Sequence, residues 1–465
     1  MSHYPITAHA CVQAFSSGQV SARELAAAAL ERITVQNPLL NAFVEITGKR
    51  ALAEADVLDN MHKRGDKLPV LAAVPYAVKN LFDVVGVTTL AGAKLLSRNP
   101  CAKEDAVLVD RMRVAGGLLL GTLNMDALAY GFTTENTHYG VTRNPHDTLR
   151  SAGGSSGGTG AAVASGLVPI GLGSDTNGSI RVPASLCGVF GLKPTYGRLP
   201  RTRTFPFVAS FDHLGPLAGN VEDLALAYDA MQGYDAGDPA CVQRSIANTV
   251  DNLKRGVDGL RVARLTGYFD DNAGDDARWA ATTAAAALGV CDEVELVGTD
   301  KARAAAFVIT ATEGGELHLD NLRTRSQEFE PLSVDRLIAG TLVPASWYQH
   351  AQRYRRLYLE RMRALFEQYD VLIAPATPVT APLLGQSHIV VGGRELATRP
   401  NMGLLTQPIS FVGMPVVVAP LWTSGGLPMG VQLIAPPWRE DLCLRAAWVL
   451  QAQGYASTRV AGITR

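Results

Sequence analysis

The feature that most constrains this chain is a run of glycine and serine, SAGGSSGGTG, at residues 151–160. It places two adjacent serines, Ser155 and Ser156, among five glycines. Glycine in regular structure costs roughly 0.5–1 kcal/mol relative to alanine, so this density requires a reason. The run could be a flexible linker, a phosphate-binding loop or a turn that carries a nucleophile.

The residues that follow this run argue against a flexible linker. Apolar segments VPIGLG and LCGVFGLKP occupy residues 168–173 and 186–194, and both have the composition of buried strands. A glycine–serine linker carries no such residues, because it does not pack into a core. The run is therefore predicted to lie within a folded domain.

Two familiar loop types also fit the run poorly. A phosphate-binding loop needs a lysine after its glycines, and none follows here. The sequence GGSSG does match the pattern G-x-S-x-G around Ser155 and, shifted by one, around Ser156. That pattern marks a nucleophile directly after a strand, whereas the preceding TRNPHDTLRSA is typical of a loop. Nucleotide binding and an α/β-hydrolase triad are therefore both disfavoured.

Outside this run, strand-like and helix-like segments alternate along the whole chain of 465 residues. A capping-box pattern at Ser21 and Glu24 predicts the start of a helix, and VLAAVPYAVKN at residues 70–80 predicts a buried strand. The alternation indicates the α/β class with a mixed sheet. We expect one domain over residues 1–465, composed of an N-terminal helical segment (1–65), a core (66–233) and the remainder of the α/β fold (234–465).

Net charge and cysteine content indicate which kind of molecule the protein binds and in which cellular compartment it works. The formal net charge is −1, so no electrostatic argument favours nucleic acid or an anionic membrane. The six cysteines show no metal-ligand spacing, and we expect reduced thiols and no metal site. The N-terminus lacks a secretory pattern, and no apolar run reaches the ~18 residues that span a bilayer. We expect a cytoplasmic protein that acts on a small molecule.

A second serine, Ser179 in SDTNGSIRVP, is placed for nucleophilic chemistry. It follows the apolar segment 168–173 and stands next to Gly178, where backbone N–H groups can converge on one point as an oxyanion hole. A base is also needed, and the lysine of the buried segment 70–80 is Lys79. Desolvation lowers the pKa of a lysine, so Lys79 could act in its neutral form, although a structural ion pair is an alternative. A serine from the glycine-rich run could pass a proton between the two.

These features together resemble the amidase signature family. The resemblance covers nearly the whole chain and rests on GGSSGG at 153–158, SDTNGSIRVPAS at 174–185 and VPYAVKN at 74–80. It is also carried by LGTLNMDALAYGFTTENTHYG, SFDHLGPLA, VLIAPATP and GMPVVVAP. The resemblance implies amide hydrolysis on a central mixed, twisted β-sheet covered by helices on both faces, with neither a metal nor an organic cofactor.

The family resemblance also implies a role for each matching residue. Ser179 would be the nucleophile, Lys79 the base, and Ser155, preceded by a cis peptide bond, the serine that bridges them. The oxyanion hole would be formed by the backbone N–H groups of Thr176, Asn177, Gly178 and Ser179. Structural support would come from Asp175, Arg181 and Ser156.

Two departures from the family pattern concern the substrate. Asn177 stands where the family commonly has glycine, so its side chain is a candidate for substrate binding. Relatives that hydrolyse glutamine hold its carboxylate with an arginine, which corresponds to Arg355, and its ammonium with an aspartate, whose place falls near Gly403. Without that aspartate glutamine is disfavoured, and a substrate with a carboxylate and a primary amide fits better. Arg355 could also be a solvated arginine on a basic helix face.

Within the family, the chain is similar to the branch that hydrolyses 1-carboxybiuret and biuret-type ureides, with release of ammonia, in cyanuric acid (s-triazine) breakdown. The resemblance implies a hetero-oligomer with a small companion protein like the C subunit of amidotransferases. Two alternatives stay open. One is the glutamine-hydrolysing A subunit of a tRNA-dependent amidotransferase, and the other is a non-catalytic nucleotide-binding or scaffold protein.

Overall fold

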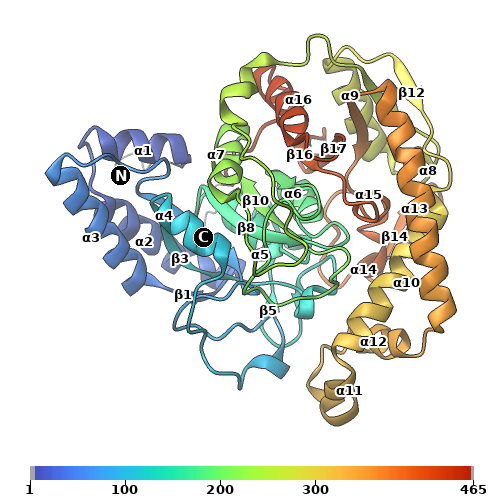
Figure 1. Cartoon of the computed structure of the whole chain (residues 1–465), viewed down its shortest axis with the longest axis horizontal. Coiled ribbons are helices and arrows are strands. Elements are labelled where there is room, and N and C mark those ends of the chain that lie inside the picture. The colour runs from blue at the N-terminus through green and yellow to red at the C-terminus, as the bar shows by residue number, and fades with distance from the viewer. Residues whose placement is uncertain (1–5, 462–465) are drawn as a thin grey trace.

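A sheet of eleven strands runs through the computed structural model, which describes residues 6–461 (Figure 1). The strand order is β1-β3-β2-β8-β10-β9-β16-β17-β13-β11-β12. The bounds of these strands are β1 (Phe43–Ile46), β2 (Val74–Lys79), β3 (Gly117–Leu123), β8 (Ile170–Asp175), β9 (Phe190–Lys193), β10 (His213–Ala218), β11 (Val262–Leu265), β12 (Asp292–Val294), β13 (Val371–Pro375), β16 (Val416–Trp422) and β17 (Pro428–Ile434).

The sheet is mixed. β2 pairs in parallel with β3 and β8, and β11 pairs in parallel with β12 and β13. Antiparallel pairs connect β8 to β13 through β10, β9, β16 and β17. β2, β3 and β8 are buried along their whole length, which explains their near-continuous apolar sequences. The predicted α/β class with a mixed sheet is confirmed.

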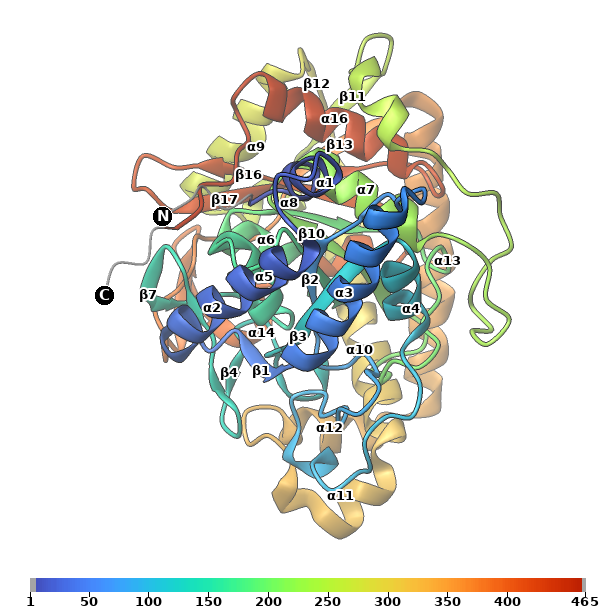
Figure 2. The same cartoon turned by 90° about the vertical axis from the view of Figure 1, so that its left-hand side faces the viewer.

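Helices cover both faces of this sheet (Figure 2). On one side, α5 (Gly157–Ala164) packs against β8, and α6 (Arg181–Cys187) packs against β16 and β17. On the other side, α7 (Val221–Met231) packs against β10, and α16 (Glu440–Ala452) packs against β16. Every residue of α5 and α6 is buried, so the loops that lead into these two helices are anchored in the core.

The first segment of the chain is helical, as predicted. It contains α1 (Ala8–Ser16), α2 (Ala22–Leu40) and α3 (Gly48–Arg64), and α4 (Val107–Val114) precedes β3. Ser21 and Glu24 cap each other's backbone at the start of α2, which confirms the capping box. α2 and α3 pack together beside β3 (Figure 2).

A helical lobe lies beside the sheet and consists of α10 (Thr299–Leu317), α11 (Leu319–Arg325), α12 (Val334–Thr341) and α13 (Ala345–Gln368) (Figure 1). α12 crosses α10 at close range. A Cβ added to Gly340 would meet the backbone of Ala311, and one added to Gly315 would meet the carbonyl of Leu337. Glycine at these two positions therefore allows the two helices to pack with their backbones in contact.

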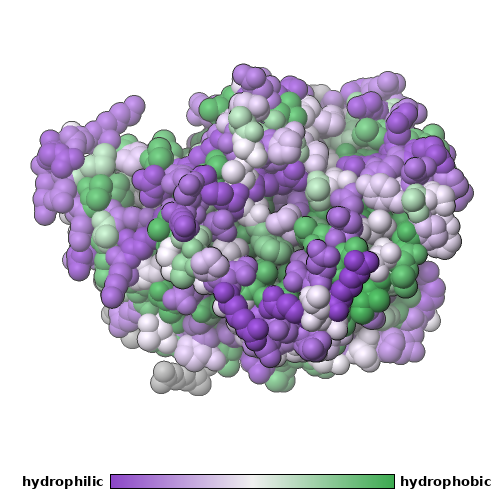
Figure 3. All heavy atoms as spheres, turned by 60° about the horizontal axis from the view of Figure 1, so that its bottom comes forward, coloured by the Kyte–Doolittle hydropathy of each residue, from purple (hydrophilic) through white to green (hydrophobic). Residues whose placement is uncertain are grey.

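The lower end of this lobe carries exposed apolar side chains. Leu332, Ile338, Leu342 and Trp347 are all exposed. Figure 3 brings the lower side of the molecule forward and shows apolar patches among polar residues on that face.

The remaining elements are short, apart from α9 (Asp275–Ala287), which packs on β13 and β17. Short strands are β4 (Glu135–Asn136), β5 (Gly140–Val141), β6 (Arg143–Asn144), β7 (Asp147–Ser151), β14 (His388–Val391) and β15 (Arg394–Ala397). Single helical turns are α8 (Tyr268–Asp271), α14 (Thr398–Asn401) and α15 (Gln407–Ser410), and 3-10 turns occur at Lys94–Leu96, Ala127–Ala129, Val250–Arg255 and Ser326–Glu328. Over residues 6–461, no helix has the length and apolar character needed to cross a bilayer.

Candidate active site

Lys79 ends β2, and its side chain is fully buried. Its Nζ donates to Ser155 Oγ at 2.6 Å and to Ser174 Oγ at 2.9 Å. Burial lowers the pKa of Lys79 from 10.5 to about 7, although nearby carboxylates oppose this shift. A lysine with this pKa is neutral in a large fraction of molecules near pH 7, so Lys79 can accept a proton.

Ser155 lies in the loop before α5, and the peptide bond between Gly154 and Ser155 is cis, as predicted. The glycine collar, residues 153–158, lies directly against both side chains and backbone of neighbouring segments. A Cβ added to Gly154 would meet the Asp126 carboxylate, and one added to Gly158 would meet the backbone of Asn124. All of residues 151–160 are buried, which confirms that the run is not a flexible linker.

Ser156 joins the glycine collar to the chain around Ser179. Its backbone N–H donates to the Ser179 carbonyl at 3.3 Å, and its hydroxyl donates to the Ser174 carbonyl at 3.2 Å. The structure therefore brings the serines of the two sequence motifs side by side, and Ser156 connects their backbones.

Ser179 lies in the β8–α6 loop, residues 176–180, and is 2% exposed. The carboxylate of Asp175, at the end of β8, accepts hydrogen bonds from the backbone N–H groups of Gly178 at 2.7 Å and Ile180 at 3.3 Å. Gly178 has φ = +137°, and a Cβ there would meet the Thr406 side chain. The Asp175 carboxylate thus holds the loop through its backbone N–H groups. At Gly178 the loop passes Thr406 too closely for a residue with a Cβ.

Arg181 secures the same carboxylate and is itself fully buried. Its Nε and Nη2 donate to Asp175 at 2.9 and 3.0 Å, and its Nη1 donates to Gln432 Oε1 at 2.6 Å. Burial alone would raise the pKa of Asp175, but the charge and hydrogen bonds of Arg181 hold it well below its usual range. Asp175 is therefore a charged structural anchor, with no free oxygen for chemistry.

Asn177 points toward the helical lobe. Its Nδ2 donates to Thr310 Oγ1 on α10 at 2.9 Å, and its carbonyl accepts from Thr406 Oγ1 at 2.7 Å. Its Oδ1 is buried and has no hydrogen-bond partner in the described part of the chain. A buried amide oxygen without a partner is costly, so it can accept a hydrogen bond from a bound molecule.

A pocket opens at Ser179 between the β8–α6 loop and the helical lobe, and we call it the Ser179 pocket. Asn177 and Thr310 form part of its wall, and Phe132, Phe207 and Phe307 supply aromatic surface. Arg336 of α12 also lines it. The Arg336 guanidinium stacks 4.1 Å from the centre of the Tyr130 ring and donates to the Tyr130 carbonyl at 3.1 Å.

The structure does not bring Arg355 to the Ser179 pocket. Its guanidinium donates to the carbonyls of Phe411 at 2.6 Å and Ser210 at 3.0 Å and lies over the Phe211 ring. The arginine that lines the pocket is Arg336, which sequence reasoning missed. The sequence around Arg336 contains only a weak signal for a role in the pocket, because this residue reaches the pocket through the close packing of α12 on α10.

Gly403 lies against Phe132, and a Cβ added to it would meet the Phe132 ring. No carboxylate side chain could stand at this position without displacing that ring. Within residues 6–461, no cluster of three or more His, Cys, Asp or Glu side chains has the spacing to hold a metal ion.

The chain matches a known protein family along most of its length. The family sequence model described as Amidase matches residues 24–444. A curated relative is AtzE of Pseudomonas sp. (strain ADP), which is a subunit of 1-carboxybiuret hydrolase and is 60% identical over 96% of this chain and 98% of its own length. The A subunit of the glutamyl-tRNA(Gln) amidotransferase of Moorella thermoacetica is 35% identical over 97% of each chain.

Solved structures agree with these relatives. One is described as "An unexpected vestigial protein complex reveals the evolutionary origins of an s-triazine catabolic enzyme", and it matches with a TM-score of 0.97 and 59% identity over 97% of this chain and all of that one. A bacterial aryl acylamidase of the amidase signature family matches with a TM-score of 0.89 and 26% identity over 97% and 96% of the two chains.

The buried Asp175–Arg181 pair predicts a large difference in stability between two arginine variants. Arg181→Met leaves the buried Asp175 carboxylate without its cation and should lower the free energy of unfolding by about 3–5 kcal/mol. Arg23→Met breaks a solvent-exposed pair with Asp56 and should leave it nearly unchanged. Urea unfolding followed by circular dichroism measures both, and equal effects of the two substitutions would contradict the anchoring role of Arg181.

Proposed function

This chain belongs to the amidase family, and we propose that Ser179, Ser155 and Lys79 together hydrolyse an amide bond of a small substrate. The observation that carries the proposal is the 2.6 Å hydrogen bond from Lys79 Nζ to Ser155 Oγ. A fully buried lysine with a lowered pKa donates to Ser155, and the next residue, Ser156, donates its backbone N–H to the Ser179 carbonyl, which supports a relay of protons through the serines. By family the chain is a hydrolase of carbon–nitrogen bonds, and its geometry supports a role for each of the three residues.

In the proposed reaction, neutral Lys79 accepts the proton of Ser155 while Ser155 takes the proton of Ser179. Ser179 Oγ then attacks the amide carbon, and the new oxyanion accepts hydrogen bonds from backbone N–H groups of the β8–α6 loop. The N–H of Gly178 already donates to Asp175, so we assign the donors to Thr176, Asn177 and Ser179. Gly178 instead shapes the loop.

The relay then runs in reverse. Its proton passes to the leaving nitrogen, the carbon–nitrogen bond breaks, and ammonia departs from an acyl-enzyme on Ser179. Water, losing a proton to the same relay, attacks the acyl carbon and releases the acid. The scheme requires no metal and no organic cofactor.

The walls of the Ser179 pocket support a carboxylate-bearing ureide as substrate. Arg336 can pair with a carboxylate, and the unpartnered Oδ1 of Asn177 can accept an N–H of the substrate. Because Phe132 fills the space in front of Gly403, an α-ammonium would have no carboxylate there, which disfavours glutamine. Together with the 60% identity to AtzE, this supports 1-carboxybiuret or a biuret-type ureide of s-triazine catabolism.

Removal of either end of the relay should abolish the reaction. Ser179→Ala and Lys79→Ala are each expected to lower the rate of ammonia release by at least about a thousandfold, because the residues of a relay act as one unit. Ser165→Ala removes a buried serine hydroxyl whose hydrogen bonds, within residues 6–461, all go to the backbone of α5, and it should keep near-normal activity. Near-normal turnover by Ser179→Ala or Lys79→Ala would disprove the assignment.

Arg336 should select for the substrate carboxylate. Arg336→Met is expected to raise KM for carboxybiuret by about 10–100-fold, since a hydrogen bond to a charged group is lost, and to change kcat/KM for biuret little. Succinamate carries a carboxylate where butyramide carries a methyl group. Arg336→Met should likewise raise KM for succinamate and change kcat/KM for butyramide little. Arg355→Met is the matched variant and should not discriminate within either pair. Ammonia release that is fastest from glutamine would instead favour the amidotransferase alternative.

We also propose that a small companion protein resembling an amidotransferase C subunit binds this chain in a hetero-oligomer. One close structural relative is described as a protein complex, which supports assembly without identifying the companion here. Chain purified by an affinity tag from its native host should carry one small polypeptide in fixed molar ratio through gel filtration, identified by mass spectrometry. A fully active, thermally stable chain that purifies alone would contradict this proposal.

A further inference from the structure

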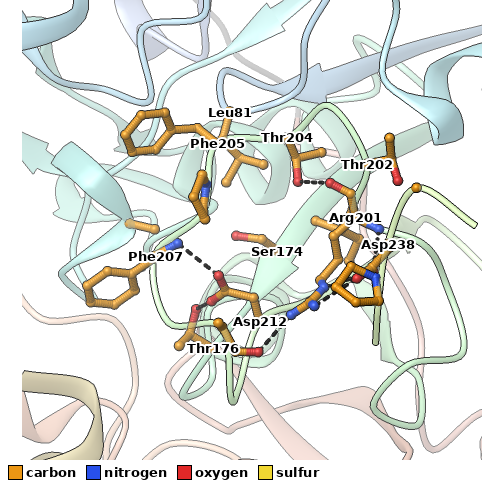
Figure 4. A pocket seen from close by; sticks show the side chains of 16 residues that line it. Leu81, Ser174, Thr176, Arg201, Thr202, Thr204, Phe205, Phe207, Asp212 and Asp238 are labelled. Atoms are coloured by element: carbon orange, nitrogen blue, oxygen red, sulfur yellow. Dashed lines mark hydrogen bonds and ion pairs between the residues drawn. The ribbon is translucent and has the colours of Figure 1, made fainter. Parts of the chain in front are cut away.

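Asp212 lies in the SFDHLGPLA segment, directly before β10 and beside the end of β8. It lines a cavity of about 220 Å³, which we call the Asp212 cavity (Figure 4). Ser174, which bonds Lys79, also lines this cavity. Thr176 and Phe207 line both the Asp212 cavity and the Ser179 pocket, so these two residues form a wall between the cavity and the pocket.

The Asp212 carboxylate holds that shared wall together with both of its oxygens. Oδ1 accepts a hydrogen bond from Thr176 Oγ1 at 2.7 Å. Oδ2 accepts from the backbone N–H groups of Phe207 at 2.8 Å and Val208 at 3.0 Å. Figure 4 shows Asp212 between Thr176 and Phe207. One side chain thus fixes the β8–α6 loop and the aromatic wall of the Ser179 pocket relative to each other.

The same carboxylate is one of three that act on Lys79, the others being Asp126 and Asp175. These two have arginine partners: Arg399 lies 2.9 Å from Asp126, and Arg181 lies 2.9 Å from Asp175. Over residues 6–461 no ion pair reaches Asp212, because Arg201 of the same cavity pairs with Asp238 at 2.9 Å. Of the three carboxylates, Asp212 alone has no ion pair within residues 6–461, although burial raises its pKa and the charge of Arg201 acts on it.

We propose that Asp212 is a positioning residue of the proposed reaction, fixing Thr176 and Phe207 relative to each other through its hydrogen bonds. Its negative charge also acts on Lys79. This inference rests on the proposed function. Without Asp212, burial of Lys79 would be opposed by two carboxylates that are already paired with arginine. A less basic Lys79 accepts the serine proton less well, so the negative charge of Asp212 raises the pKa of Lys79 in the direction that proton transfer requires.

Asp212→Asn tests the charge while preserving the contacts. An asparagine oxygen can accept from the Phe207 and Val208 N–H groups, and its NH₂ can donate to Thr176 Oγ1. Loss of a negative charge near Lys79 lowers the pKa of its ammonium. In the pH profile of kcat/KM, the acid limb, where activity falls as Lys79 becomes protonated, should therefore move to lower pH. We expect the ratio of kcat/KM at pH 6 to that at pH 8 to rise roughly threefold.

Thr176 tests the positioning role separately. Thr176→Val removes the hydroxyl but keeps the Asp212 charge, so kcat should fall roughly tenfold or more through misplacement of the loop while the acid limb stays in place. Thr176→Ser retains the hydroxyl and should keep most of kcat. These two variants decide the positioning role even if Asp212→Asn does not fold.

Asp229 provides a matched control. Its carboxylate also accepts from two backbone N–H groups, of Thr249 and Val250, and from the Thr249 hydroxyl, and it accepts a further hydrogen bond from Gln232 Nε2. It is not among the carboxylates that act on Lys79. Asp229→Asn should therefore leave both kcat and the acid limb unchanged.

A titration of Lys79 that needs no turnover separates this inference from the proposed function. Lysine labelled with ¹³C at Cε, observed by NMR in the Ser179→Ala background, should titrate at lower pH when Asp212→Asn is added. Failure of the proposed function would appear as activity surviving Ser179→Ala. An unmoved Lys79 titration and acid limb in Asp212→Asn would overturn the charge role, and equal kcat in Thr176→Val and Thr176→Ser would overturn the positioning role.

Discussion

The burial of one amino group is the constraint on which the site depends. Lys79 ends a strand that is buried along its whole length. Among the described residues, its Nζ has hydrogen bonds only to the hydroxyl groups of Ser155 and Ser174. A charged ammonium is poorly stabilised there, so the interior itself drives deprotonation. The neighbouring carboxylates of Asp126 and Asp175 are held by Arg399 and Arg181, which keeps their charges from fully opposing that effect.

The serines are brought to this amino group by glycines that allow close packing and by one buried ion pair. The glycine collar allows the loop before α5 to lie against residues 124–134, and Gly178 allows the β8–α6 loop to pass Thr406. The Asp175–Arg181 pair then ties that loop to Gln432 on β17, far along the chain. The two loops are fixed because α5 and α6, which follow them, are buried on all sides.

The sequence was informative where local pattern and burial coincide. The apolar run around Lys79 predicts its strand and its burial, and the structure confirms both. The glycine collar and SDTNGSIRVP predict loops that lie together, and the hydrogen bond from the Ser156 N–H to the Ser179 carbonyl connects these loops. Arg336 could not be found this way, because its place in the pocket depends on contact between α12 and α10 through Gly340. Arg355 was expected in the pocket, yet backbone carbonyls of Phe411 and Ser210 hold it elsewhere. The β14–β15 hairpin, in which HIVV pairs with RELA, was likewise not anticipated.

The close packing of the glycine collar leaves no room for substitution beside the serines of the site, whereas the helical lobe on the other side of the site does leave room. No side chain larger than hydrogen can be introduced at Gly154, Gly157 or Gly158 without displacing backbone or side chains of residues 124–134. The opposite wall is built from Phe307, Thr310 and Arg336, which are ordinary side chains on two helices. A new substrate preference can therefore arise by exchange of residues on the helical lobe while the serines and lysine keep their positions, so one hydrolytic half can serve amides of quite different shape.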